Sequence, residues 1–421
     1  MARLFICALV TGLASVTAFG EAQWFKGATH VHSLWSDGDA APEHIIQWYK
    51  SRGWDFVCNS EHNTLMQGVR YETVQPEGKL TPARVQALSA EFGQDWVELQ
   101  YNEAGELTMR LKTIDELRTH FEEPGEFILV PSEEMTTLKG NPHVNALNVR
   151  EVVPGLPGEG DKTEKIQHYV DQIAAQSRKY GQPMIAHVNH VNFSDRITTE
   201  ELMQVNGLAF FEVYNGHANV FSWGIPAEGA PSGERHWDVI LAMKQRREPD
   251  YLLYGVATDD SHHYHEYKVG QSNPGRGWVM VRAEVLEPNA IVAAMQRGDF
   301  YASTGVTLKE VKCDGKSLSV RVEGAEGVTY KTQYIGTRKG FDEAAKPALD
   351  PAGAPLPRSS LIYSDSIGVV LHETTDLDSS YTFAGDEMYV RARVVSNRVQ
   401  ANPHAEGDYE MAWVQPVLAR E

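Results

Sequence analysis

The sequence predicts an α/β fold, which we expect to be a barrel, followed by a smaller antiparallel β-sandwich. Over the first 305 residues, at least six apolar strand-like segments alternate with amphipathic helix-like segments. From about residue 306, short β segments are separated by Gly, Asp and Ser turns, and helical patterns are nearly absent. A chain of 421 residues is long enough for two such domains. We therefore expect a barrel over 21–305 and a sandwich over 306–421.

The composition is typical of a soluble globular protein, with 42% hydrophobic and 23% charged residues. The formal net charge of −19 repels phosphate backbones, so nucleic acid is not expected as the main partner. Three cysteines provide neither a disulfide framework nor the paired spacing of a zinc–thiolate site.

The first 20 residues predict a secretory signal peptide. One positive charge in MAR precedes the apolar run LFICALVTGLASV, and small residues follow near Ala18 and Gly20. The alternative is a buried N-terminal helix. A signal peptide implies a secreted or periplasmic protein, and the absence of a second such run predicts no stable membrane anchor.

The chain continues with a strand–helix–strand unit. The stretch GATHVHSLWSDG (27–38) places His30 and His32 two apart in a strand, so both imidazoles share one face. Asp37 follows in a turn. A helix is expected over 42–53, and the next strand ends at His62. Active groups of parallel units gather at the carboxyl ends of the strands.

Residues 64–125 interrupt this alternation and predict an inserted subdomain. It contains a helix with Thr81 as its N-cap and Gly93 as its stop, then a hairpin over 96–112. A helix with a capping box follows, formed by Thr113 and Glu116.

Fourteen of the sixteen histidines precede residue 270, and several stand at the ends of predicted strands. Imidazole and carboxylate groups are ligands for zinc, manganese or iron, and the number of candidates exceeds what one tetrahedral ion needs. A site with two or three metal ions is the natural inference; unrelated histidines are the alternative. The candidate ligands are His30, His32, Asp37, His62, Glu134, His143, His187, Asp260 and His262.

Six motifs appear in the order in which a known family has them. They are THVHSLWSDG, NSEHN, VPSEE, His143, IAH at 185–187 and DDSH at 259–262. The stretch from about Lys26 to Gly305 resembles the PHP (polymerase and histidinol phosphatase) family of metal-dependent phosphoesterases. The leader, the insertion and the C-terminal β segments resemble its secreted branch, related to carbaryl hydrolase.

The resemblance implies a distorted (β/α)7 barrel that holds up to three divalent transition-metal ions (Zn, Mn or Fe). Glu134 would bridge two ions, because VPSEE matches the family pattern at its second acid, although Ser132 replaces the usual Gly. Asp260 is preferred to Asp259 because the family spacing is Asp-x-His. The implied sets are His30, His32, Glu134 and Asp260 for the first ion, Glu134, His143 and His187 for the second, and Asp37, His62 and His262 for the third.

Several neighbouring residues are weaker candidates for a role at the site. Lys139 and Arg276 lie in loops where they could clamp a phosphate, and solvated loop charges are the alternative. His190 follows His187 by three and is expected at the surface or behind the ligands. Glu212 ends a strand and could orient a ligand imidazole, while His217 is a candidate for the rim.

The resemblance implies a multinuclear metal-dependent hydrolase whose small-molecule substrate is a phosphate ester. A metal-bridging hydroxide would be the nucleophile, and Glu134, Asp260 and His262 would be the catalytic residues. Hydrolysis of a carbamate or aryl ester at the same site is the first alternative, and a non-catalytic metal- or glycan-binding protein is the second.

Overall fold

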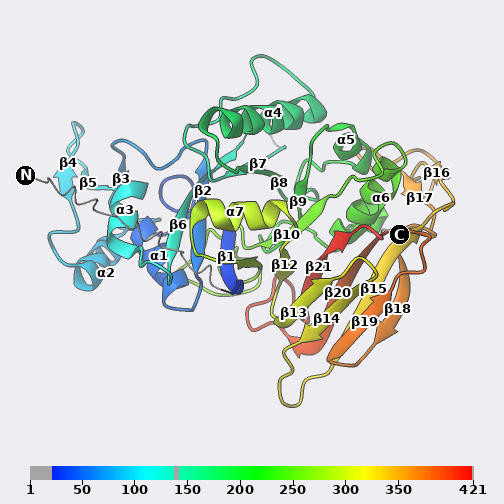
Figure 1. Cartoon of the computed structure of the whole chain (residues 1–421). Helices are drawn as coiled ribbons and strands as arrows, with labels where there is room; N and C mark the ends of the chain where they lie inside the picture. Colours follow the sequence, from blue (N-terminus) through cyan, green and yellow to red (C-terminus); the bar gives the residue numbers. More distant parts are fainter. Residues whose placement is uncertain (1–20, 137–141, 420–421) are drawn as a thin grey trace, which may run out of the picture.

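The computed structural model describes residues 21–136 and 142–419 (Figure 1). The predicted signal peptide lies outside these residues and stays a prediction. Within the described ranges, seven α-helices accompany a sheet of 13 strands, which confirms the mixed α/β architecture. The helices are α1 (Pro42–Lys50), α2 (Pro82–Phe92), α3 (Ile114–Phe121), α4 (Lys162–Tyr180), α5 (Thr199–Gln204), α6 (Gly233–Gln245) and α7 (Pro288–Gln296).

The large sheet has the strand order β10-β9-β8-β7-β6-β2-β1-β11-β12-β21-β20-β15-β18. Its strands are β1 (Gln23–Val31), β2 (Phe56–His62), β6 (Ile128–Met135), β7 (Val144–Leu147), β8 (Ile185–Val188), β9 (Phe210–Asn215), β10 (Tyr254–Thr258), β11 (Trp278–Ala283), β12 (Phe300–Ser303), β15 (Tyr330–Arg338), β18 (Val369–Thr374), β20 (Glu387–Val399) and β21 (Tyr409–Val417).

The strands from β10 to β1 in this order form the part of the sheet that positions the candidate site. β1, β2 and β6 run parallel, and β8, β9 and β10 also run parallel, whereas β7 is antiparallel to both β6 and β8. An isolated parallel bridge joins Val31 to Ser261, just beyond β10. The first and last of these strands therefore meet at their carboxyl ends.

The C-terminal strands form two β layers, and one of these layers belongs to the large sheet. β21 pairs with β12, so β21, β20, β15 and β18 continue the large sheet. A second sheet, β13 (Leu308–Cys313), β14 (Ser317–Val322) and β19 (Asp378–Thr382), packs its apolar side chains against them. Two β layers do form, but one of them is the end of the sheet that carries the candidate site.

The helix ends follow from local sequence. Asp161 and Glu164 form a capping box at the start of α4, and Gly181 ends the helix in the left-handed conformation. Thr81 caps α2 as predicted, and the predicted capping box of Thr113 and Glu116 begins α3. These caps fix helix boundaries that apolar periodicity alone leaves open.

The insertion adds a small sheet of its own, ordered β3-β5-β4, beside α2 and α3 (Figure 1). Its strands are β3 (Tyr71–Thr73), β4 (Leu99–Tyr101) and β5 (Leu107–Arg110). The predicted hairpin corresponds to β4 and β5. One short antiparallel pair, β16 (Ala345–Lys346) with β17 (Ile362–Tyr363), and the 3-10 helix η1 (Pro226–Glu228) complete the elements.

Among the helices that the structure describes, none combines the length and the apolar character needed to cross a membrane.

Candidate metal centre

The candidate site lies where the parallel strands end. His30 and His32 come from the end of β1 and just beyond it, His62 ends β2, and Glu134 lies near the end of β6. Asp260 follows β10, where its backbone N–H donates to the carbonyl of His30 at 3.1 Å. The shared edge of the strands thus brings together residues that are more than 200 positions apart in the sequence.

Glu134 stands at the centre of the cluster and is buried. Its Oε1 lies 3.1–3.4 Å from three imidazole nitrogens, and its Oε2 lies 2.8–3.4 Å from two more. Both carboxylate oxygens are thus shared, as a bridging ligand requires. The histidines concerned are His30, His143 and His190 at Oε1, and His32 and His62 at Oε2.

Asp260 is the second buried carboxylate of the cluster. Its Oδ1 lies 3.3 Å from Nε2 of His30 and 3.3 Å from Nε2 of His32. Its backbone φ of 48° is in the left-handed region, which is uncommon for a residue with a side chain and concentrates at functional sites.

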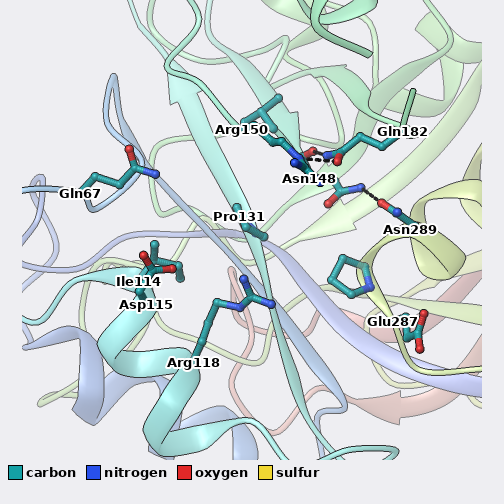
Figure 2. Close-up of a pocket in the computed structure, with 12 residues that line it drawn as sticks. Gln67, Ile114, Asp115, Arg118, Pro131, Asn148, Arg150, Gln182, Glu287 and Asn289 are labelled. Atoms are coloured by element: carbon teal, nitrogen blue, oxygen red, sulfur yellow. Dashed lines mark hydrogen bonds between the residues drawn. The ribbon is translucent and has the colours of Figure 1, made fainter. Parts of the chain in front are cut away.

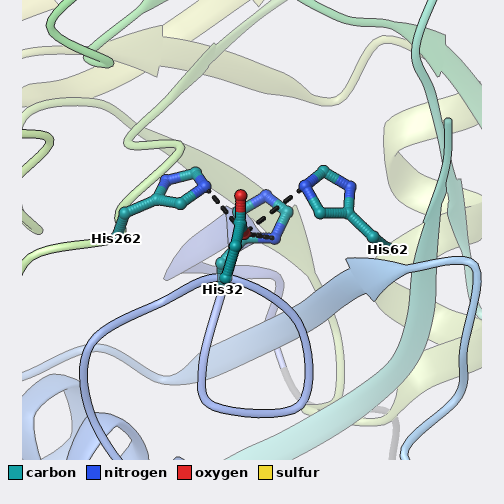
Figure 3. A group of neighbouring side chains, drawn as sticks. His32, His62 and His262 are labelled. Atoms are coloured by element: carbon teal, nitrogen blue, oxygen red, sulfur yellow. Dashed lines mark ion pairs between the residues drawn. The ribbon is translucent and has the colours of Figure 1, made fainter. Parts of the chain in front are cut away.

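Asp37 forms a third group at the open side of the cluster, where its side chain is 51% exposed. Its Oδ1 lies 3.0 Å from Nε2 of His262 and 3.4 Å from Nε2 of His62. Figure 3 shows His32, His62 and His262 arranged around the carboxylate to which the dashed ion pairs lead.

Among the residues that the structure describes, three sets of potential ligand atoms are close enough to hold an ion, since within each set the atoms lie within 4.8 Å of one another. The sets are His32, Asp37, His62 and His262; His30, His32 and Asp260; and Glu134, His143 and His190.

The protonation pattern of the imidazoles fits ion binding. His30 Nδ1 faces Glu212 Oε1 at 2.7 Å, and His262 Nδ1 faces the carbonyl of Asp260 at 2.9 Å. Both Nδ1 atoms can donate there, which turns the lone pair of Nε2 toward the carboxylates of the cluster. The buried Nε2 atoms of His30 and His32 make no hydrogen bond of ordinary geometry. Buried acceptors of this kind fit a set of ligands that share a metal ion.

The charges of the cluster also indicate competition between protons and cations. Burial disfavours the charged form of His62, but Glu134 and Asp37 outweigh it and raise the pKa of His62 to about 10. Burial and the neighbouring His262 lower the pKa of His32 to about 3. A cation bound beside Asp37 would therefore displace a proton from His62.

One predicted ligand stands outside the three sets. His187 is buried in β8 and belongs to none of them, whereas His190 joins Glu134 and His143. His190 is therefore an additional candidate beside Glu134, and His187 as a ligand stays a prediction. β8 ends at Val188, and His190 follows in the loop with a φ of 25°.

Asp259 and Glu133 directly precede the candidate ligands Asp260 and Glu134 in the sequence, but their carboxylates bind other parts of the protein. Asp259 accepts hydrogen bonds from Tyr49 and from the backbone N–H groups of 275–277. Glu133 accepts from the backbone N–H of Val153, and burial raises the pKa of Glu133 to about 7. The preference for Asp260 and Glu134 as the acids that face the histidines agrees with this arrangement.

Two buried carboxylates support the cluster from outside. Glu212, which the sequence suggested for this role, contacts His30 and also accepts from the backbone N–H of His190 at 2.6 Å. Glu61, which sequence reasoning missed, accepts from the backbone N–H of Ser33 at 3.0 Å and from Ser36 Oγ at 2.5 Å. Glu61 thereby holds the loop that carries Asp37. In the sequence, the position of Glu61 directly before the candidate ligand His62 could have indicated this supporting role.

Of the two residues predicted to clamp a phosphate, Arg276 is already engaged within the protein. Arg276 is 1% exposed, and its guanidinium donates to the carbonyls of Gly216 at 2.8 Å, Gln271 at 2.5 Å and Asn402 at 3.2 Å. Arg276 therefore joins three loops instead of facing a substrate. Lys139 lies outside the described residues.

A cavity of about 450 Å³ lies apart from this cluster, against β6 and between α3 and α7. Figure 2 shows Arg118 reaching from α3 toward Pro131 of β6, and Asn148 linked to Asn289 across the cavity wall. None of the candidate ligands lines it.

No protein-family model matches the chain, and no curated protein matches it. Similar solved structures include the following two. One is a two-domain protein of Bacteroides vulgatus described as containing a predicted PHP-like metal-dependent phosphoesterase, with 13% identity, a TM-score of 0.40 and coverage of 94% of this chain and 95% of that chain. The other, from Bifidobacterium adolescentis, is named as a metal-dependent phosphoesterase whose assignment is provisional, with 14% identity, a TM-score of 0.29 and coverage of 60% and 91%. Both TM-scores are low, so the function proposed below rests on the residues of this chain.

Proposed function

We propose that the protein is a multinuclear metal-dependent hydrolase that cleaves small phosphate esters. The observation that carries this proposal is the single carboxylate of Glu134, whose two oxygens face imidazoles of different ligand sets. A shared carboxylate surrounded by five histidines suits two or three divalent ions of the zinc, manganese or iron class. Such ions would supply the Lewis acidity that activates water and neutralises charge on the ester group.

The residues of the chain have distinct tasks in this proposal. Glu134 and Asp260 hold the buried ligands in register, and Glu212 keeps the proton of His30 on Nδ1. Asp37, which is half exposed, and His262 form the side of the cluster through which a substrate enters. Substrate selection falls to groups around this entrance, because the guanidinium of Arg276 is already occupied.

A phosphate ester is the substrate class that suits this centre. Neutral histidines and few carboxylates around several divalent ions leave a positive local field, which attracts an anion despite the net charge of the whole chain. The same centre could also polarise the carbonyl of a carbamate. Activity measurements on both substrate classes therefore have to distinguish them.

The test measures metal content by elemental mass spectrometry, together with hydrolysis of p-nitrophenyl phosphate and of an aryl carbamate. We expect two or three transition-metal ions per chain and phosphatase activity. In Glu134→Gln, we expect fewer metal ions per chain and an activity lower by about 100-fold, since the bridging charge is lost.

Glu133→Gln is the matched control, because its side chain accepts from Val153 and faces none of the histidines. It should keep both metal and activity. Metal with only carbamate cleavage would change the substrate class. A protein that binds no metal after reconstitution with zinc, manganese or iron would contradict the proposal and leave a binding protein.

A further inference from the structure

His217 lies beside the Asp37 side of the metal centre, on the loop that follows β9. Its ring centroid is 5.2 Å from that of His262 and 5.6 Å from that of Phe193, with both pairs edge to face. His217 is half-buried and belongs to none of the three ligand sets. It is therefore close to the proposed site of reaction without being one of the grouped ligands.

The hydrogen bonds of the loop define which ring nitrogen carries the proton. The backbone N–H of Asn219 donates to Nδ1 of His217 at 3.2 Å, so Nδ1 is the acceptor. The proton of the neutral ring then resides on Nε2. Among the described residues, Nε2 of His217 has no hydrogen-bond partner. The ring thus presents an unused N–H donor beside His262.

The backbone of His217 is connected through Asn215 to the buried acids of the centre. Its N–H donates to Asn215 Oδ1 at 2.7 Å. The amide nitrogen of Asn215 in turn donates to Asp260 Oδ2 at 3.1 Å and to Glu212 Oε2 at 2.8 Å. One side chain therefore sets the position of His217 relative to the candidate ligands.

The outer side of this loop is held as firmly. Arg276 donates to the carbonyl of Gly216 at 2.8 Å and to the carbonyl of Asn402, between β20 and β21, at 3.2 Å. The backbone N–H of Ala218 donates to Ser272 Oγ at 3.2 Å. A donor held on both sides loses little conformational entropy when it binds, which is the arrangement expected of a preorganised substrate contact.

We propose that Nε2–H of His217 donates a hydrogen bond to an oxygen of the substrate's ester group, which makes His217 a substrate-binding residue. This inference rests on the hydrolase proposed above and deepens it by naming a recognition group at the entrance. A neutral N–H donor suits an anionic phosphoryl oxygen, because it stabilises the charge and adds no cation that would compete with bound metal ions. It also fills the role that Arg276 cannot fill.

The test compares two substitutions that separate donation from packing. His217→Phe keeps an aromatic ring between Phe193 and His262 but removes the donor. His217→Gln loses the ring but can place its amide N–H near the position of Nε2. We expect H217F to lower kcat/KM for p-nitrophenyl phosphate by about 10- to 100-fold, which is the loss of one hydrogen bond to a charged group. H217Q should recover a substantial part of this loss, and metal content should be unchanged in both variants.

His372→Phe, on the exposed face of β18, is the control for an arbitrary histidine replacement and should behave as the native protein. Native kcat/KM in H217F would overturn the inference. A loss in H217Q but not in H217F would assign His217 to packing, equal losses in both would show that an N–H donor at this position does not restore the contact, and loss of metal would make His217 part of the metal centre; all three results overturn the inference. If H217F does not fold, H217A replaces it as the variant without a donor.

Failure of this inference is distinguishable from failure of the proposed function. A native protein that binds metal and hydrolyses the ester, but is indifferent to H217F, retains the proposed function and loses only the contact. A native protein without metal and without hydrolysis overturns both.

Discussion

Among single residues, His190 and His187 show how a shift of three positions changes a role. Both are buried, but His190 Nε2 lies 3.4 Å from Glu134 Oε1, whereas His187 belongs to none of the three ligand sets. His190→Ala should lower the metal content by one ion per chain, as measured by elemental mass spectrometry, because the set with Glu134 and His143 loses a ligand. His187→Ala should keep the native metal content. The reverse pattern would make His187 the ligand.

His236 predicts a pH dependence of stability that is independent of the metal centre. The ring is buried in α6 beside Thr199, and burial lowers the pKa of His236 to about 3. The unfolded side chain titrates near pH 6.5. The unfolded state therefore binds the proton between these values, and the stability that neutral His236 contributes above pH 6.5 is lost as the pH falls below it.

The expected size follows from the same linkage. Between pH 7 and pH 5 the native protein should lose about 2 kcal/mol more free energy of unfolding than His236→Phe does, as measured by urea unfolding at both pH values. His372→Phe, at an exposed position, should lose as much as the native protein. Parallel losses in the native protein and H236F would contradict a buried neutral His236.

At the scale of elements, the insertion holds the loop of Asp37. Lys79 Nζ donates to the carbonyl of Asp37 at 2.5 Å, and Arg84 donates to the carbonyl of Asp39 at 3.1 Å. The backbone N–H of Asp39 continues the connection to the carbonyl of His262 at 2.8 Å. The segment before α2 and its first turn thus position the most exposed of the candidate ligands.

The double substitution Lys79→Ala and Arg84→Ala should therefore weaken one ion selectively. We expect about 10- to 100-fold lower affinity for the ion beside Asp37, which titration with a chelator should reveal as one site released early. Arg321→Ala, at an exposed position of β14, is the control for the loss of a cation elsewhere in the protein. Equal weakening of every bound ion would show that the insertion supports the whole fold instead of this loop.

Local patterns in the sequence predicted these elements but not all of their contacts. Capping residues such as Thr81 and Thr113 act within one turn, so their helices could be located from the sequence. The direction in which a loop returns after β8 depends on tertiary packing, which is why the sequence alone does not place His190 beside Glu134. The same limit applies to Arg276, whose acceptors lie on loops as distant as Asn402.

At the scale of the whole molecule, the C-terminal β layers are continuous with the part that carries the candidate site. Because β12 pairs with β21, the large sheet continues across the expected domain boundary. Trp413 and Tyr389 share one apolar cluster with Trp237 of α6. Strand order in a sheet is set by contacts between distant segments, and turn composition near residue 306 could not reveal it.

Arg391 of β20 joins the same two parts through a buried ion pair. Its guanidinium donates to both oxygens of Asp238 in α6, at 2.8 and 2.7 Å, and Nη1 lies 2.9 Å from Glu234. Arg391→Met leaves two buried carboxylates without this cation, and it should lower the free energy of unfolding by about 3–5 kcal/mol. Urea unfolding should measure the loss, with His372→Phe as an exposed control.

The same experiment tests whether the parts unfold together. Because the sheet and an apolar core run through both, loss of bound metal and loss of β-sheet circular dichroism should shift to lower urea by the same amount in R391M. Separate midpoints, with metal release unchanged and only part of the β signal shifted, would mean that the C-terminal layers unfold independently. A common shift would mean that the β layers stabilise the metal centre through α6, since Asp238 and Glu234 lie on the helix that follows the loop of His217.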